Sequence, residues 1–274
     1  MKRLITLCLI ALGLIVFQVS IKAQATGPQT GPLIPPPPRG SFPELERVPT
    51  TSSAYNRYPP TREEKVIQKG ILAPSESDVA QHQFLLSQKK TGLMRLLPRE
   101  NFDWEVFKVP KQVDMRGGGA FFSFHYRSHE YGYGSDILYD QGKLSVGFAG
   151  ADYGIITDLG DIPLDSIIAE DPRALYLHNY EPPGQERDAR SEARKYSVNH
   201  GVRVDGVLYG RETQAQLNHT YLLRSIVYER SDVLVALRIV SINEDGGLTI
   251  AWKILKEFSP TKLTRDEANL RRHH

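Results

Sequence analysis

After residue 92 the chain carries short runs rich in β-branched and aromatic residues, separated by glycine-containing turns, and this pattern predicts strands. Strands are expected at residues 103–109, 119–130, 143–148, 153–157, 218–229, 233–242 and 248–257. Short polar turns join the last three, which predicts an antiparallel meander. Because apolar residues fall on both faces of these strands, the meander is expected to lie inside the domain, with Trp252 in the core.

Four polar stretches have helical spacing instead. Helices are expected at residues 61–70, 74–90, 182–196 and 264–272. Thr61 with Glu64 fits a capping box at the start of the first, and Gly92 is a natural stop after the second. The third mixes charges of both signs, with Glu186 and Arg190 one turn apart, which is typical of a solvated surface helix.

These elements predict an α+β fold that is mainly antiparallel β, a sandwich or a partly open barrel, with a few peripheral helices. The expected organisation is a signal peptide at 1–25, a proline-rich disordered linker at 26–60, a helical lead-in at 61–92, a β-rich domain at 93–258 with the charged helical insertion near 182–196, and a polar helix or tail at 259–274.

The first 25 residues have the order of a secretory signal. Lys2 and Arg3 precede a long apolar run, and Ala23-Gln24-Ala25 provides the small–x–small pattern that signal peptidase cleaves. The alternative is an uncleaved anchor, since the run of 18 residues from Leu4 to Ile21 is at the lower limit for crossing a bilayer. We therefore expect a secreted or periplasmic protein, or one that contacts the membrane only through this segment.

Composition narrows the classes of partner and chemistry. Removing the three cations of the signal takes the formal net charge from +2 to −1, and a chain so nearly neutral lacks the basic surface that nucleic acid requires. The single cysteine, Cys8, lies inside the signal, so the mature chain has no disulfide, catalytic thiol or thiolate metal site. Ten of the 18 prolines fall in residues 26–60, which favours an extended, unfolded linker.

The expected strand at 119–130 carries the most unusual chemistry. Alternation places aromatic residues on one face and polar residues on the other: Phe122, Phe124 and Tyr126 against Ser123, His125, Arg127 and His129. A glycine-punctuated loop adds Glu130, Tyr131, Tyr133 and Asp136. Aromatic rings beside carboxylates and imidazoles are typical of clefts that bind sugars or peptides, whereas a solvated polar face is the plain alternative. The candidate ligand site is His125, Arg127, His129, Glu130, Tyr131, Tyr133 and Asp136.

A metal site and a hydrolase are weaker interpretations of the same region. His125 and His129 would stand about 13 Å apart on a strand, at about 3.3 Å per residue, which is too far to share one ion. Five aspartates, at positions 136, 140, 152, 158 and 161, could flank a glycosidic bond, but aspartate beside glycine is also an ordinary turn residue. We expect no metal, no cofactor and no catalytic residue.

The sequence thus predicts an exported or envelope-tethered binding or structural module rather than an enzyme, with a cell-envelope glycan or peptide as its partner. The alternative is a secreted glycan hydrolase that uses carboxylates within residues 130–161.

The cleavage pattern predicts that the exported protein begins at Thr26. Amino-terminal sequencing of material recovered after export measures this directly. A chain that still begins at Met1 would mean that the segment anchors the protein.

Overall fold

The structure is a computed structural model, and it describes residues 62–99, 106–108, 112–114, 119–129, 134–148, 151–197 and 201–265. All of them belong to one unit, Tyr58–His274. The expected signal and linker, the cap at Thr61 and most of the expected helix at 264–272 lie outside the described residues.

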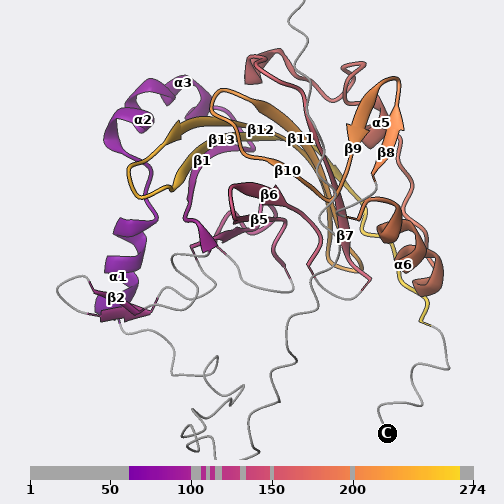
Figure 1. Cartoon of the computed structure of the whole chain (residues 1–274), viewed down its shortest axis with the longest axis horizontal. Coiled ribbons are helices and arrows are strands. Elements are labelled where there is room, and N and C mark those ends of the chain that lie inside the picture. The colour runs from indigo at the N-terminus through magenta and orange to yellow at the C-terminus, as the bar shows by residue number, and fades with distance from the viewer. Residues whose placement is uncertain are drawn as a thin grey trace, which may run out of the picture. The chain divides into compact units, whose positions relative to one another are not determined.

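A five-stranded antiparallel sheet is the largest element of this unit (Figure 1). Its strands follow in the order β1 (Thr91–Leu96), β13 (Leu248–Phe258), β12 (Ser231–Ile242), β11 (Thr220–Val227) and β7 (Tyr153–Asp158). The neighbours β11, β12 and β13 are consecutive in the chain, which confirms the predicted meander.

A smaller, four-stranded sheet lies beneath the arch of the large one in Figure 1. Its order is β10 (Glu212–Gln214), β6 (Lys143–Ser145), β5 (Ile137–Asp140) and β4 (Phe121–Phe122). Two ribbons complete the strands: β2 (Val106–Lys108) with β3 (Gln112–Asp114), and β8 (Val202–Val204) with β9 (Val207–Tyr209). The fold is the α+β, mainly antiparallel arrangement that the sequence predicts.

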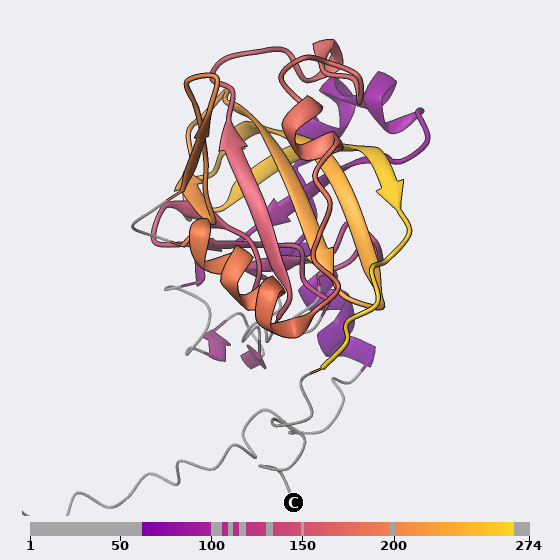
Figure 2. The same cartoon turned by 90° about the vertical axis from the view of Figure 1, so that its right-hand side faces the viewer.

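Two hydrophobic cores cover the two faces of the large sheet. The inner core lies between the sheets and joins Leu223 and Trp252 to residues of the small sheet such as Phe122 and Leu144. The outer core packs the opposite face against α5 (Leu175–His178), α6 (Glu186–Lys195) and the single turn η2 (Leu164–Ser166). Figure 2 shows α5 and α6 in front of the strands. Because both of its faces are covered, every residue of β11 is buried.

The charged insertion is the helix α6, as predicted, and Arg190 donates to Glu186 at 2.6 Å. Its inner side is nevertheless buried, because Ala189 packs in the outer core. The lead-in helix α1 (Arg62–Ile71) ends within a residue of its predicted end.

The prediction of a single helix at residues 74–90 is wrong. Two short helices, α2 (Glu76–Gln81) and α3 (Gln83–Leu86), replace it, with a break at His82. Lys90 then takes a left-handed conformation (φ 61°) and turns the chain into β1. Gly92 is therefore a strand residue and not a helix stop. A Cβ there would stand 2.6 Å from Cζ2 of Trp252, so glycine makes room for the indole ring.

The long strand predicted at 119–130 is also wrong. Strand β4 ends at Phe122, and the chain folds back so that Ser123 and Ser128 exchange backbone hydrogen bonds. Arg127, in the left-handed region at φ 54°, belongs to the turn between them. The two predicted faces do not exist, because Ser123 is buried and Tyr126 is exposed.

The buried carboxylate of Asp136 joins the two sheets. Its Oδ1 accepts from the hydroxyl of Ser225 in β11 (2.6 Å), and its Oδ2 accepts from the backbone N–H of Phe124 (2.6 Å) and the hydroxyl of Ser123 (3.2 Å). Burial raises the pKa of Asp136, and the hydrogen bonds that lower it offset this only in part. The turn at residues 123–128, which follows β4 and is called the β4 turn below, is thus fixed by a polar contact between the two sheets.

We expect Asp136→Asn to lower the free energy of unfolding by about 1–3 kcal/mol, because the amide replaces one acceptor with a donor that faces other donors. Since burial raises the folded-state pKa, the folded protein holds this proton more tightly than the unfolded chain does. The contribution of Asp136 to stability therefore falls as pH rises from about 4 through the folded-state pKa.

Urea denaturation of both proteins at about pH 4 and about pH 8 should show the stability difference narrowing at the higher pH. Asp161→Asn, at a side chain that is 70% exposed, is the matched control and should change stability by about 1 kcal/mol or less. A difference that widens with pH would contradict the raised pKa.

Candidate functional site

A cleft of about 440 Å³ opens between the end of β13 and the segment that follows α5. Lys256 and Phe258 line it from the strand, and residues 178–182 line it from the segment. Arg224 and Asp232, from β11 and β12, form its floor. The size falls in the range of roughly 300–1,000 Å³ that is usual for small-molecule sites.

A β-bulge directs Lys256 into this cleft. In β13, Ile254 pairs with Val235 but Lys256 pairs with Leu234, so the register slips by one residue at Leu255. Strand periodicity would put residues 254 and 256 on the same face. Instead Ile254 lies in the inner core, and Lys256 reaches Phe258 and His178 on the outer side of the sheet. Bulges often re-aim a side chain in this way next to functional sites.

The Lys256 ammonium is held by a short chain of contacts. The Nδ1 atom of His178 lies 2.7 Å from the carbonyl oxygen of Ala169, which only accepts, so Nδ1 carries the proton. The other ring nitrogen, Nε2, then accepts from Nζ of Lys256 at 2.7 Å. The same Nζ lies 4.6 Å from the centroid of the Phe258 ring, a favourable cation–π distance. The ammonium is therefore positioned while its other donors remain available.

The floor of the cleft is a buried ion pair. Arg224 donates from Nε and Nη2 to the two carboxylate oxygens of Asp232, at 2.7 and 2.9 Å, and each side chain is only 2% exposed. The Nη1 atom of Arg224 donates to the carbonyl of Leu177 at 2.5 Å. This carbonyl is in the last turn of α5, where the helix itself provides no hydrogen-bond donor for it. The guanidinium carbon lies 3.5 Å from the centroid of Phe258. This pair thus ties β11, β12, β13 and α5 together.

Residues 178–183 form the rim of the cleft, and hydrogen bonds hold this rim before and after Glu181. The hydroxyl of Tyr180 lies 2.5 Å from that of Tyr153, and Tyr228 donates to the carbonyl of Pro183 at 2.8 Å. Burial raises the pKa of both Tyr153 and Tyr180, so these hydroxyls stay protonated. Glu181 itself is exposed, and the two prolines after it restrict its backbone to extended conformations.

The side chains that line the cleft carry equal numbers of positive and negative charges, but only two of the four form an ion pair. Its charged side chains are two cations, Lys256 and Arg224, and two carboxylates, Glu181 and Asp232. Arg224 and Asp232 neutralise each other at the floor. Within the described part of the chain, neither Lys256 nor Glu181 forms an ion pair. The cleft therefore contains one cation and one anion that no described side chain neutralises.

The structure separates the residues of the predicted ligand site. His125 and Arg127 are exposed in the β4 turn, and Asp136 is buried between the sheets. The Nε2 atom of His129 lies 2.7 Å from the carbonyl oxygen of Arg95. Burial lowers the pKa of His129, and the hydrogen bond to Arg95 offsets this lowering only in part. The other three residues, Glu130, Tyr131 and Tyr133, lie outside the described residues. A binding role for this set stays a prediction.

The described aspartates of the hydrolase alternative have separate partners. Asp140 pairs with Arg99, Asp152 accepts from the backbone of Tyr228, and Asp161 pairs with Arg238. Among the described residues, no three histidine, cysteine, aspartate or glutamate side chains are grouped closely enough to hold a metal ion. No helix in the ranges that the structure describes is long and apolar enough to cross a membrane.

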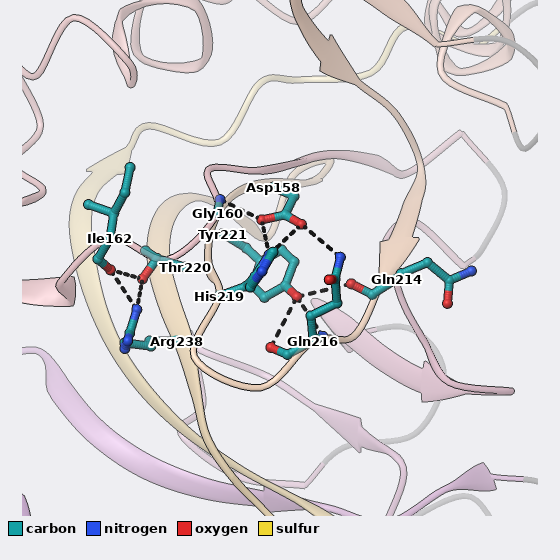
Figure 3. A network of polar contacts seen from close by, with 9 residues as sticks. All are labelled: Asp158, Gly160, Ile162, Gln214, Gln216, His219, Thr220, Tyr221 and Arg238. Atoms are coloured by element: carbon teal, nitrogen blue, oxygen red, sulfur yellow. Dashed lines mark hydrogen bonds and ion pairs between the residues drawn. The ribbon is translucent and has the colours of Figure 1, made fainter. Parts of the chain in front are cut away.

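Asp158 belongs to a polar network where the chain crosses from the small sheet to the large one (Figure 3). Its carboxylate accepts from the backbone of Gly160 at 2.7 Å and lies 2.9 Å from Nδ1 of His219. Nearby, the hydroxyl of Tyr221 donates to the carbonyl of Gln214 and accepts from the backbone of Gln216. These bonds fix the connection between β10 and β11, so we interpret the network as structural.

Sequence reasoning missed the cleft. Two signals pointed to it: Arg224 and Asp232 are opposite charges in mostly apolar strands, and Pro182-Pro183 marks a rigid segment. The bulge at Leu255 had no such signal, because 248–257 reads as an ordinary strand. Comparisons with protein-family models, curated proteins and solved structures found no match.

Arg224→Met is expected to lower the free energy of unfolding by about 3–5 kcal/mol, because Asp232 would remain as a buried carboxylate without its partner. The double variant Arg224→Met/Asp232→Leu should recover most of this loss, since no buried charge remains. Urea denaturation measures both. As a control, Lys90→Met breaks the exposed pair with Glu257 and should cost about 1 kcal/mol or less. A double variant as unstable as the single one would show that the ion pair is not the cause.

Proposed function

We propose that the protein is an exported binding protein whose cleft accepts a ligand with a carboxylate group, and that Lys256 recognises this group. The observation that carries the proposal is a fixed ammonium without a counter-ion. The bulge directs Lys256 into the cleft, and His178 and Phe258 hold it there. No carboxylate of the described chain pairs with it.

Fixing a lysine side chain costs up to about 2 kcal/mol of conformational entropy, which a surface ion pair rarely repays. A ligand that meets an ammonium already in place avoids that cost, which is the general basis of preorganised binding. An ammonium has three donors, and His178 accepts only one of them. The other two suit the oxygens of a carboxylate.

The balance of charge favours a carboxylate over a phosphate. The floor pair cancels itself, and Glu181 at the rim opposes a second negative charge on the ligand. The separate partners of the aspartates at 140, 152 and 161 favour binding over hydrolysis. The export of the protein rests on its amino-terminal pattern and is part of the proposal.

Acetyl-alanyl-alanine, which has a carboxylate and no free amine, is the first probe. We expect isothermal titration of the purified full chain to detect binding that weakens about tenfold or more in Lys256→Gln, because a hydrogen bond to a charged group contributes about 1.5–3 kcal/mol. The amide of the same peptide should not bind. Added salt should weaken binding, as for any partly exposed charge pair.

Lys253→Gln is the matched control. It removes the same charge from the same strand, but Lys253 contacts the carbonyl of Asp165 and does not line the cleft. Its affinity for the probe should equal that of the wild type. Equal loss in both variants would point to general surface charge, and absence of binding to the wild type would refute the proposal.

A further inference from the structure

The unpaired carboxylate of Glu181 shares the cleft with Lys256. Glu181 lies three residues after the end of α5, whereas Lys256 lies on β13, so the two charges come from separate segments of the chain. Within the described residues, they form no ion pair with each other or with any other side chain. His178 holds the Lys256 ammonium, whereas Glu181 is exposed and only its backbone is restricted, by Pro182.

We infer that the cleft binds a zwitterion, a short peptide or amino acid whose carboxylate meets Lys256 and whose free α-ammonium meets Glu181. The inference rests on the proposed function and adds the second charge to it. Such a ligand is neutral overall, like the lining itself, so both ion pairs form without leaving a net charge in the cleft.

The size and surface of the cleft agree with this class of ligand. About 440 Å³ is near the lower end of small-molecule sites and is adequate for a peptide of a few small residues. The ring of Tyr180 also lines it and offers apolar contact to a side chain of the ligand. A sugar acid would use Lys256 but would offer Glu181 only neutral hydroxyl donors and no cation.

The test compares peptides that differ in one charged end. Isothermal titration of the full chain with alanyl-alanine should give an affinity about tenfold higher than with acetyl-alanyl-alanine, because the blocked peptide cannot form the charge-assisted bond to Glu181. In Glu181→Gln the two peptides should bind equally. Glu244→Gln changes the same group in the turn between β12 and β13, away from the cleft lining, and should keep the tenfold preference.

Three results would overturn the inference. If both peptides bound equally well and through Lys256, the second charge would have no role, although the proposed function would stand. If glucuronic acid bound more tightly than alanyl-alanine and lost affinity in Lys256→Gln, the cleft would be a sugar-acid site. If no carboxylate compound bound, the proposed function would fail together with the inference. Unchanged thermal unfolding of each variant ensures that a loss of binding is not a loss of fold.

Discussion

The packing of the large sheet against the outer core depends on the buried ion pair of Arg224 and Asp232. This ion pair joins two neighbouring strands of the meander, and the same guanidinium stacks on Phe258 from the third. Its remaining donors bind the end of α5. Because an unpaired charge cannot remain at such a buried position without a large cost, the residues around it are constrained together. The position of the cleft follows from this pair, since its floor and both walls contact Arg224.

The β-bulge in β13 then gives the cleft its cation. It brings Lys256 to the same side of the sheet as Phe258, and Glu181 lines the cleft from the segment after α5. Without the bulge, an ammonium at position 256 would point toward the inner core, where Ile254 and Trp252 lie. A charge there would be unpaired and buried. The register of the sheet therefore decides both the stability of the core and the presence of a cation in the cleft.

Around the inner core, between the two sheets, polar contacts fix how the sheets are arranged. Asp136 holds the β4 turn against β11 through Ser225, and the Asp158 network fixes the crossing between the sheets. Both are satisfied by hydrogen bonds at or near the core, which gives the two sheets one defined arrangement. The polar residues around the inner core thus set the arrangement of the two sheets, whereas the cleft beside the outer core keeps two charges, Lys256 and Glu181, that form no ion pair within the described residues.

The sequence by itself determined the elements whose signal is local. The meander, α6 with its Glu186–Arg190 pair, and Trp252 in the core all follow from periodicity and turn residues, which act over a few positions. Residues 119–130 also have a strand-like pattern, yet β4 ends at Phe122 and residues 123–128 form a turn. The contact of Asp136 with β11, which joins positions 89 residues apart, helps to fix this turn. The sequence singled out Asp136 as unusual, but only the tertiary structure showed that it faces the other sheet.

The cleft was decided by the tertiary structure alone. The segment that holds His178 and Glu181, the strand of Arg224 and the strand of Lys256 are three separate parts of the chain, and no spacing along the sequence connects them. Which face Lys256 occupies depends on a slip of one residue between two strands, and that slip is set by packing on both sides of the sheet. Periodicity can therefore identify a strand, but it cannot show where the pairing of two strands shifts or which distant residues that shift brings together.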